Sequence, residues 1–595
     1  MSTVNDSVSA THATPTFTKP DVASMAVAPT MASYETLYKT YDWSQTEKAL
    51  NWPRKNGYNL ATLCIDGHPD EVMQRDALIW VSKDGKEERY TFADLKRETN
   101  KLANALTRLG IKQGDRVFTF LERVPEVYIS VFAALKVQAL VGPLFAAFGP
   151  EAIRDRLSDC QAKVLITSPE LKGRFEQIMR DCPSIEYVIV VDREGTYKLT
   201  VETDPDVLLY SDLMASADAA FDVPHTDKNQ PSIIHYTSGT TGKPKGAVHR
   251  HYSAVSQAAT AKYVLDLQPE TDVYWCTADP GWVTGTSYGM IGPWALGTTQ
   301  LVYEGGFNPE TWYKLIQDYK VTVWYTAPTA IRMLMKAGEA PIQAYDLSSL
   351  RHLLSVGEPL NPEAIVWGEA QFGHVFHDTW WQTETGCMHI CNYASMTVKA
   401  GSMGRPHPGV VAGILDEDGN ELEAGQEGHL VVRPDAPSFF QTYWGRQELY
   451  DSRFKNGWYY TGDRAWRDED GYYWFVGRAD DVINTAGHLV GPFEVESALV
   501  AHPAVAEAGV IGKPDAERME IVKAFISLKA GYEDSEKLRE EIRLFVRNRL
   551  AAHAYPREIE VLEGLPKTRS GKIMRRLLKA RELGLPEGDV STLET

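Results

Sequence analysis

The sequence has little that would place the protein in a membrane or in an oxidising compartment. No run approaches the roughly 18 uncharged apolar residues that a membrane-spanning helix needs. The first thirty residues lack arginine and an apolar signal-peptide core, which argues against a mitochondrial presequence and against secretion. The six cysteines include no CxxC pair, so neither a disulfide framework nor a thiolate metal cage is indicated. We expect a cytoplasmic protein with reduced thiols and no membrane partner.

Basic residues are also scarce relative to acidic ones. There are 61 Lys and Arg against 80 Asp and Glu, giving a formal net charge of −19. Most of such a surface repels polyanions, so nucleic acid is excluded as a general partner. The exception is the stretch 567–581, which has seven Lys or Arg and no acid. It is either an anion-attracting patch or the favourable basic end of a helix.

The most informative stretch that is present is 236–246, which reads Tyr-Thr-Ser-Gly-Thr-Thr-Gly-Lys-Pro-Lys-Gly. Glycines let backbone N–H groups approach an anion closely, while hydroxyls add donors and lysines add charge. It is not a Walker A loop, because Pro244 rather than Ser or Thr follows Lys243. The alternative is a polar surface turn between a strand at 233–234 and a helical stretch at 249–267. The phosphate-binding interpretation involves Thr237, Ser238, Gly239, Thr240, Thr241, Gly242, Lys243 and Lys245.

Length and alternation of patterns predict the fold. A chain of 595 residues exceeds the size of one hydrophobic core, so at least two domains are expected. The buried run 353–356 reads as a strand, Asn361 and Pro362 as the N-cap and first residue of a helix, and 375–376 as the next strand. This is a βαβ unit of a parallel sheet, and ligands gather where its strands end, at 357–359 and from 378 onward. An amphipathic helix is predicted over 534–553.

Further blocks along the chain resemble one family. A second Ser-Gly turn that presents a lysine lies at 570–572, and between the two lysine loops stand the blocks 357–359, 378–386, 460–463, 477–481 and 491–496. In this order they resemble the adenylate-forming acyl-CoA synthetases, and the resemblance covers residue 34 to the end. The tryptophans of the 378–386 block resemble the AMP-forming members that activate acetate.

The resemblance implies an α/β fold with a large domain and a small mobile domain. A large N-terminal adenylation (AMP-binding) domain over 34–479 would contain mixed and parallel sheets covered by helices. A small mobile α+β domain over 480–595 would rotate about a hinge at Asp480, and residues 1–33 would form a disordered tail. The implied reaction joins acetate to ATP as acetyl-AMP with release of pyrophosphate, and then transfers the acetyl group to CoA.

The family's functional positions carry over residue by residue. The 237–245 loop would hold the β- and γ-phosphates, Asp463 and Arg478 the ribose, and Lys572 would bridge the carboxylate and the α-phosphate. Further nucleotide and catalytic positions are Gly357, Glu358, Pro359, Asp378, Thr379, Trp380, Trp381, Gln382, Thr383, Glu384 and Gly487. The acyl pocket would be Val283, Thr284, Val356 and Trp381, and the CoA contacts Thr284, Asn308, Ala486, Gly487 and Arg547, with Lys172 and Arg174 as weaker candidates.

Two implied features concern metal and modification. A Mg²⁺ site would use Val500, His502 and Val505, although a valine offers only its backbone carbonyl. Glu384 is an equal candidate for the ATP-bound ion. Lys572 would be a target for a lysine acetyltransferase and a deacetylase, because acetylation removes its charge.

Some alternatives stay open at the level of sequence. The family arginine expected at position 489 is Leu489, so its phosphate contact is either replaced by His488 or dispensable. The run 285–289 matches the G-x-S-x-G pattern of hydrolases, which need no ATP. A non-catalytic nucleotide-binding protein would be expected to lose groups such as Lys572. Propionate or another small acid could replace acetate as the substrate.

Overall fold

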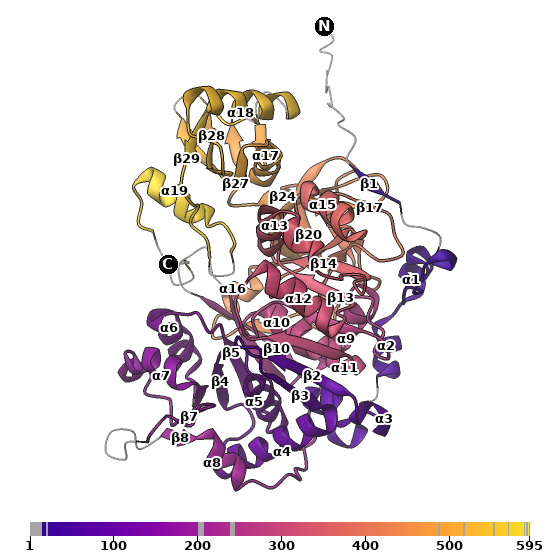
Figure 1. Ribbon diagram of the computed structural model, residues 1–595, viewed down its shortest axis with the longest axis vertical. Helices are drawn as coiled ribbons and strands as arrows, with labels where there is room; N and C mark the ends of the chain where they lie inside the picture. Colours follow the sequence, from indigo (N-terminus) through magenta and orange to yellow (C-terminus); the bar gives the residue numbers. More distant parts are fainter. Residues whose placement is uncertain are drawn as a thin grey trace.

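Two large sheets covered by helices are followed by a small antiparallel sheet and by a separate C-terminal part at one end of the molecule (Figure 1). The computed structural model describes residues 15–18, 22–50, 52–199, 207–237, 244–485, 488–515, 518–550, 554–568, 571–587, 590 and 593. Among the helices of this part of the chain, none combines the length and apolarity that crossing a membrane requires.

The first large sheet has eight strands, parallel from β9 to β8 and antiparallel at the β9–β10–β21 edge. Its strands β5 and β6 are fully buried, and β4 is buried except at Arg116, as expected of a sheet covered on both faces. In spatial order the strands are β21 (Thr442–Tyr443), β10 (Lys245–Arg250), β9 (Pro231–Thr237), β5 (Leu140–Leu144), β4 (Arg116–Phe120), β6 (Val164–Thr167), β7 (Tyr187–Val190) and β8 (Val207–Leu209).

The second large sheet has nine strands and contains the predicted βαβ unit. Strand β14 and strand β15 are parallel neighbours joined by α15, with Asn361 as the N-cap and Pro362 as the first helical residue. In spatial order the strands are β18 (Arg405–Pro406), β16 (Ile390–Cys391), β15 (Phe376–Trp380), β14 (His352–Val356), β13 (Val323–Thr326), β11 (Val273–Cys276), β12 (Thr299–Tyr303), β2 (Asp76–Val81) and β3 (Glu87–Thr91).

Helices pack against both large sheets. Proline is the first residue of α12, α13 and α15, where its missing N–H is not needed. The helices before residue 480 are α1 (Tyr34–Thr40), α2 (Trp43–Ala49), α3 (Asp70–Met73), α4 (Phe92–Arg108), α5 (Pro125–Lys136), α6 (Pro150–Cys160), α7 (Pro169–Glu176), α8 (Tyr210–Ala215), α9 (Ala254–Tyr263), α10 (Val283–Thr286), α11 (Gly292–Leu296), α12 (Pro309–Tyr319), α13 (Pro328–Ala337), α14 (Ala340–Gln343), α15 (Pro362–Phe372) and α16 (Gln447–Asp451).

One predicted helix starts later than the sequence pattern indicated. The stretch 249–267 is not helical throughout, because residues up to Arg250 belong to β10 and residues 251–253 form a single 3₁₀ turn. Pairing of β10 with β9 satisfies the backbone of these residues, and this tertiary pairing overrides their local preference. The helix itself is α9, and it ends at Tyr263.

A third, antiparallel sheet follows and leads into the C-terminal part. It contains β19 (Ala412–Leu415), β20 (Glu427–Val432), β22 (Phe454–Lys455), β23 (Trp458–Arg467) and β24 (Tyr473–Arg478), and a short separate ladder joins β1 (Thr16–Phe17) to β17 (Val398–Lys399). Because β24 pairs with β23 and the chain then enters β25, this sheet forms the connection between the two parts.

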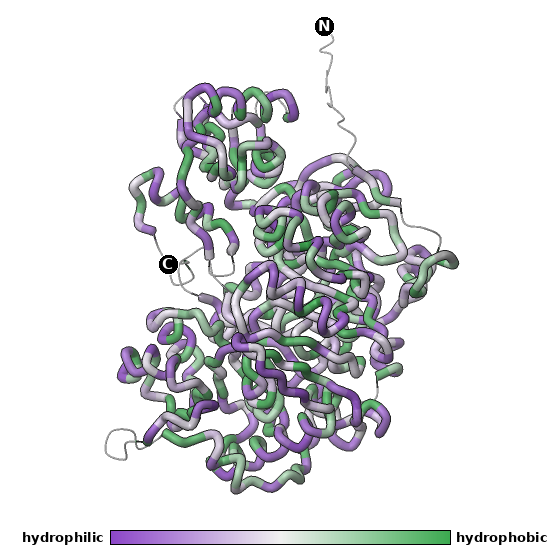
Figure 2. Tube along the Cα trace, viewed as in Figure 1, coloured by the Kyte–Doolittle hydropathy of each residue, from purple (hydrophilic) through white to green (hydrophobic). Residues whose placement is uncertain are grey.

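The C-terminal part is a small α+β unit with its own core. Its strands are β25 (Ile483–Thr485), β26 (His488–Val490), β27 (Val505–Asp515), β28 (Met519–Leu528) and β29 (Glu558–Val561), and its helices α17 (Pro492–Val500), α18 (Glu536–Arg549) and α19 (Arg575–Leu583). Helix α18 is shorter than the predicted 534–553, beginning after the N-cap Ser535 and ending at Arg549. Its purple and green turns alternate in Figure 2, as expected of an amphipathic helix.

Candidate active site

Asp463 and Arg478 form the centre of the site. They face each other across β23 and β24, and Arg478 Nη1 donates to Asp463 Oδ1 over 2.9 Å. The other carboxylate oxygen accepts from Trp380 Nε1 and Gln382 Nε2, each at 3.0 Å. Burial raises the pKa of Asp463, while Arg478 and the Trp380 indole oppose that shift. Three donors, from β24, from β15 and from the residues just after β15, therefore fix one carboxylate.

A glycine within β23 allows Asp463 and Arg478 to approach each other closely. Gly462 has φ +78, and a Cβ there would come within 2.9 Å of Arg478 Nη2. Gly357, directly after β14, has φ +94, a conformation that side chains rarely adopt. Residues 357–359 follow β14, and 378–382 contain the end of β15 and the two residues after it, so both segments lie at the carboxyl edge of the β14–β15 pair, where α/β sheets bind ligands.

Asp378 faces the core rather than this edge. Its carboxyl accepts from Ser355 Oγ at 2.8 Å, and only 5% of the residue is exposed. Burial raises its pKa to about 7. A nucleotide contact at this position would have to use the backbone. The following residues alternate, so that Trp380 and Gln382 point toward Asp463 instead.

A second polar group is formed by Glu384, Tyr443 and Lys245. Tyr443 Oη donates to Glu384 Oε1 at 2.6 Å, and Lys245 Nζ stands 5.9 Å from the centroid of the Tyr443 ring. Burial and the nearby Arg453 lower the pKa of Lys245, and Glu384 counteracts them. Thr237 pairs with Lys245 in the β9–β10 ladder, at the two ends of the predicted phosphate loop. The loop residues Ser238, Gly239, Thr240, Thr241, Gly242 and Lys243 lie outside the described residues.

Lys572 reaches the site from the C-terminal part on a tight hairpin. The Thr568 carbonyl accepts from Gly571 N–H, and the Thr568 N–H donates to the Lys572 carbonyl over 2.7 Å. The residue is exposed, yet the protein around it lowers the pKa of its ammonium, as does Arg575. Glu358 and Asp463 act electrostatically on the same ammonium in the opposite direction. The lysine thus interacts with charges from the other part of the chain.

The base of this hairpin is anchored inside the C-terminal part. Arg575 Nε donates to Glu496 Oε1 at 2.6 Å, and Lys567 Nζ pairs with Glu507. Both pairs tie the hairpin to α17 and β27. Sequence reasoning did not single out Arg575 or Glu496 individually, although both lie within blocks that it used.

Two of the acyl-pocket candidates share one apolar cluster. Val356 and Trp381 belong to one apolar cluster with Tyr288 and Tyr325, in which Trp381 Nε1 donates to Tyr325 Oη at 3.3 Å. The Tyr288 ring packs edge-on against the indole with centroids 5.2 Å apart. Thr284 follows Val283 in α10.

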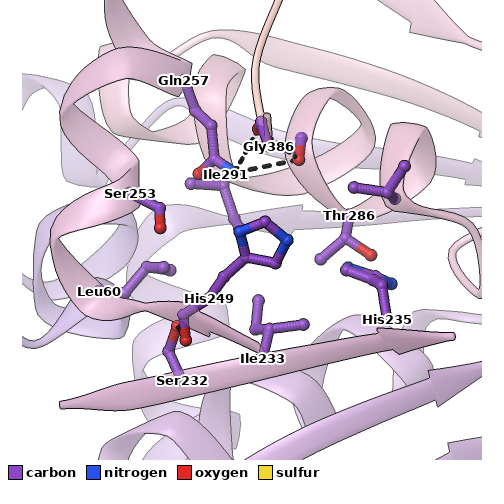
Figure 3. Close-up of a pocket in the computed structure, with 12 residues that line it drawn as sticks. Leu60, Ser232, Ile233, His235, His249, Ser253, Gln257, Thr286, Ile291 and Gly386 are labelled. Carbon is purple, nitrogen blue, oxygen red and sulfur yellow. Dashed lines mark hydrogen bonds between the residues drawn. The ribbon is translucent and has the colours of Figure 1, made fainter. Parts of the chain in front are cut away.

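Val283 instead lines a small neighbouring pocket, shown in Figure 3. The Gln257 amide donates there to the Gly386 carbonyl at 3.1 Å and to Ser287 Oγ at 3.0 Å. Burial lowers the pKa of His235 to about 3 and also lowers that of His249, so both rings are neutral near pH 7. The lining is Leu60, Ser232, Ile233, His235, His249, Ser253, Gln257, Val283, Thr286, Ser287, Ile291 and Gly386, and it includes none of the residues around Asp463.

Three of the CoA candidates have structural partners. Lys172 pairs with Glu176 and stands over the Tyr197 ring, and Arg174 donates to the carbonyls of 146 and 148. Asn308 caps α12 through its side chain. Arg547 stands over the Tyr555 ring on the exposed face of α18. Ala486 and Gly487 lie outside the described residues.

The two candidate metal positions differ in fit. His502 Nδ1 accepts from the Ala504 N–H at 3.2 Å, so Nε2 carries the hydrogen and faces Glu541 at 3.7 Å rather than offering a lone pair. In the part of the chain that the structure describes, no three His, Cys, Asp or Glu side chains gather as a metal site. Glu384 offers a single carboxylate beside Lys245, which suits Mg²⁺ because that ion usually takes one or two carboxylates together with substrate phosphates.

Comparison with known proteins places the chain in a family. Residues 66–444 match the AMP-binding enzymes and residues 494–572 match the C-terminal domain of AMP-binding enzymes. The chain belongs to this family.

Among curated relatives, it is 50% identical to the acetyl-coenzyme A synthetase of Bacillus subtilis (strain 168), covering 95% of this chain and 97% of that protein. It is 44% identical to the acetyl-coenzyme A synthetase of Methanothrix thermoacetophila, covering 86% and 80%.

Two solved structures share the fold. One is the acyl-CoA synthetase of Brucella canis, with a TM-score of 0.72 and 34% identity over 93% of this chain and 99% of that one. The other is the anthranilate CoA ligase AuaEII in complex with anthranoyl-AMP, with a TM-score of 0.80 and 30% identity over 89% and 98%. The predicted fold class, a large N-terminal sheet domain with a smaller C-terminal domain, is confirmed.

Proposed function

We propose that the protein is an AMP-forming acetate–CoA ligase. One carboxylate oxygen of acetate attacks the α-phosphorus of ATP, the bond to the β-phosphate oxygen breaks, and pyrophosphate leaves. The CoA thiol then loses its proton and attacks the acyl carbon, so that a thioester forms and AMP leaves. Curated relatives named acetyl-coenzyme A synthetase, at 40–50% identity over most of the chain, support the assignment.

The observation that carries the proposal is the meeting of two distant segments. Thr329 Oγ1 lies 3.1 Å from the carbonyl oxygen of Gly571, the residue before Lys572. Glu358 and Asp463 both raise the pKa of the Lys572 ammonium, although more than a hundred residues separate Lys572 from Asp463. An ammonium at that position would neutralise charge on the α-phosphate and the attacking carboxylate. Asp463 and Arg478 would hold the ribose hydroxyls. Such an arrangement is suited to making an adenylate.

The other candidate residues would bind the remaining parts of ATP, the metal ion and CoA. Lys245 and the loop 237–243 would bind the β- and γ-phosphates, and 357–359 with 378–383 would enclose the adenine. Glu384 would hold a Mg²⁺ ion together with phosphate oxygens, and the ion would neutralise charge on the departing pyrophosphate. For CoA we propose Thr284, Asn308, Gly487 and Arg547, with Gly487 giving room for the pantetheine arm.

To pass from the first half-reaction to the second, the C-terminal domain would rotate at its boundary with the N-terminal domain, residues 479–480. Asp480 lies just after β24, where its carboxylate stands 3.7 Å from Arg478 Nε. Rotation there would withdraw Lys572 and bring residues 486–489 to the adenylate. A cytoplasmic location is part of this proposal, and the buried, unpaired state of all six cysteines supports it.

Acetylation of Lys572 by an acetyltransferase, reversed by a deacetylase, would remove the charge that adenylation needs. Enzymatically acetylated protein is then expected to lose acetate-dependent activity, and deacetylation is expected to restore it. Full activity with the mark at Lys572 would contradict this regulatory role.

The test of the proposed function is acetate-dependent release of AMP with and without CoA. With CoA, AMP, pyrophosphate and acetyl-CoA are expected in equal amounts. Without CoA, pyrophosphate exchange into ATP should still require acetate. ATP-independent turnover would favour a hydrolase, and a strong preference for propionate or butyrate would assign another short acid.

A further inference from the structure

Three side chains on the N-terminal side form a closed group directly beside the Lys572 hairpin. Glu358 follows β14, while Thr329 and Arg332 lie in the first turns of α13, which follows β13. Thr329 Oγ1 stands 2.6 Å from Glu358 Oε1, and Arg332 Nη2 donates to Glu358 Oε2 over 2.6 Å. Arg332 Nη2 also donates to Thr329 Oγ1 at 2.8 Å. Each member of this triad contacts the other two.

The triad touches the hairpin at its tightest point. Thr329 Oγ1 lies 3.1 Å from the carbonyl oxygen of Gly571, the residue before Lys572. A Cβ added to Gly571 would lie only 2.2 Å from Thr329 Cγ2. Gly571 also has φ +90, so both its conformation and its surroundings require glycine. The backbone of the hairpin is therefore seated on Thr329.

Charge reinforces this contact. Burial alone would raise the pKa of Glu358, but Arg332, the Thr329 hydroxyl and Lys572 together hold it below its usual value. The carboxylate is therefore ionised and attracts the Lys572 ammonium, whose own pKa it raises against the desolvating effect of the protein around it. Only 12% of the Glu358 side chain is exposed, so solvent screens this attraction less than it would at the surface.

We infer that Thr329, Arg332 and Glu358 are positioning residues for Lys572 in the first half-reaction, forming the seat that holds its hairpin over the nucleotide site. The inference rests on the proposed function. It assigns the Glu358 carboxylate to the lysine hairpin, whereas the sequence resemblance grouped that residue with the nucleotide contacts.

The seat is also suited to releasing the hairpin. When Lys572 leaves, the hydrogen bonds within the triad remain, and the seat itself loses only the Thr329–Gly571 contact and the attraction between Glu358 and Lys572. No buried acceptor of the triad is left without a donor, so departure is not penalised by an unsatisfied group. One further contact joins the two parts nearby, from Asn361 Nδ2 to Ser497 Oγ at 2.8 Å.

The test compares the two half-reactions in Arg332→Met and Thr329→Val. Acetate-dependent ATP–pyrophosphate exchange is expected to fall about 10- to 100-fold in each, the effect of losing a hydrogen bond to a charged group. Conversion of presynthesised acetyl-AMP and CoA to acetyl-CoA should change by less than about twofold. Thr329→Ser keeps the hydroxyl and is expected to restore most of the exchange.

Lys336→Ala is the matched control. Lys336 lies one helical turn beyond Arg332 on the exposed side of α13, so this variant removes a cation from the same helix without touching the seat. It should leave both half-reactions unchanged. Equal loss of both half-reactions in Arg332→Met and Thr329→Val, or no loss of exchange in either, would contradict the positioning role of the triad. Absence of acetate-dependent exchange in the unmodified protein would overturn the proposed function instead.

Discussion

The Asp463 cluster and the Lys572 hairpin contribute charge to the same site, but they are held in different ways. Asp463 is fixed by three donors from β24 and the end of β15, within sheets of the N-terminal part. Lys572 depends on a turn of the C-terminal part and on a small contact with Thr329. A binding group built into sheets stays in place through both half-reactions, whereas a group on a lightly seated turn is able to leave after the first.

The largest expected effect comes from Lys572→Ala. Acetate-dependent ATP–pyrophosphate exchange should fall by about 10²- to 10³-fold, because a single charged donor to the developing phosphate charge is lost. Conversion of presynthesised acetyl-AMP and CoA should persist, since Lys572 has withdrawn by then. Comparable losses in both assays would contradict the difference between the two regions.

Asp463→Asn should affect both half-reactions, unlike Lys572→Ala. The amide cannot balance the Arg478 charge, so kcat/KM for ATP and for acetyl-AMP should each fall about 10- to 100-fold. Glu417→Gln is the control, because Glu417 pairs with the next residue of β23, Arg464, but its side chain is 75% exposed. Such a surface pair contributes little. Selective loss of only one half-reaction in Asp463→Asn would contradict a ribose-binding role.

Trp381→Gly tests the acyl pocket. Removing the indole should weaken acetate use and open activity on four- to six-carbon acids, because the ring fills volume beside Val356. In the unmodified protein, acetate should be preferred over propionate by about ten- to a hundredfold, since overpacking a methylene costs about 1–3 kcal/mol. Steady-state kinetics with a series of linear acids provides the measurement. A variant that gains nothing on longer acids would show that Trp381 is only packing.

Asp480→Pro should have a smaller and one-sided effect. Fixing φ near −65° limits rotation at the hinge, so one half-reaction should fall by about tenfold while the other is spared. Asp480→Ala removes the same carboxylate but keeps backbone freedom, and it should impair neither half-reaction as strongly. Unchanged kinetics in Asp480→Pro would show that the hinge is not at Asp480.

Much of the fold could be predicted because its signals are local. The β14–α15–β15 unit followed from a buried run, an N-cap and a proline, and the structure has all three. The helix expected from residue 249 was wrong at its start, because pairing of β10 with β9 depends on a partner strand that the local pattern does not contain.

Only those site residues that lie in sequence blocks resembling the family could be predicted. Spacing does not reveal that Asp378 turns toward Ser355, or that Val283 lines the pocket around Gln257. Thr329 and Arg332 were missed because they lie outside those blocks. One signal was available, since they follow β13 at the same carboxyl edge as Gly357, which follows the neighbouring strand β14. Their contact with Gly571 requires the two parts of the chain to be in place together.

The most direct test of the central claim is a crystal structure with CoA and a non-hydrolysable acetyl-AMP analogue bound. We predict that Asp463 and Arg478 keep their 2.9 Å contact. In the same structure, Lys572 should have moved away from Glu358, and Gly571 away from Thr329. A structure in which the CoA thiol reaches the acyl carbon while Lys572 still stands beside Glu358 would contradict it.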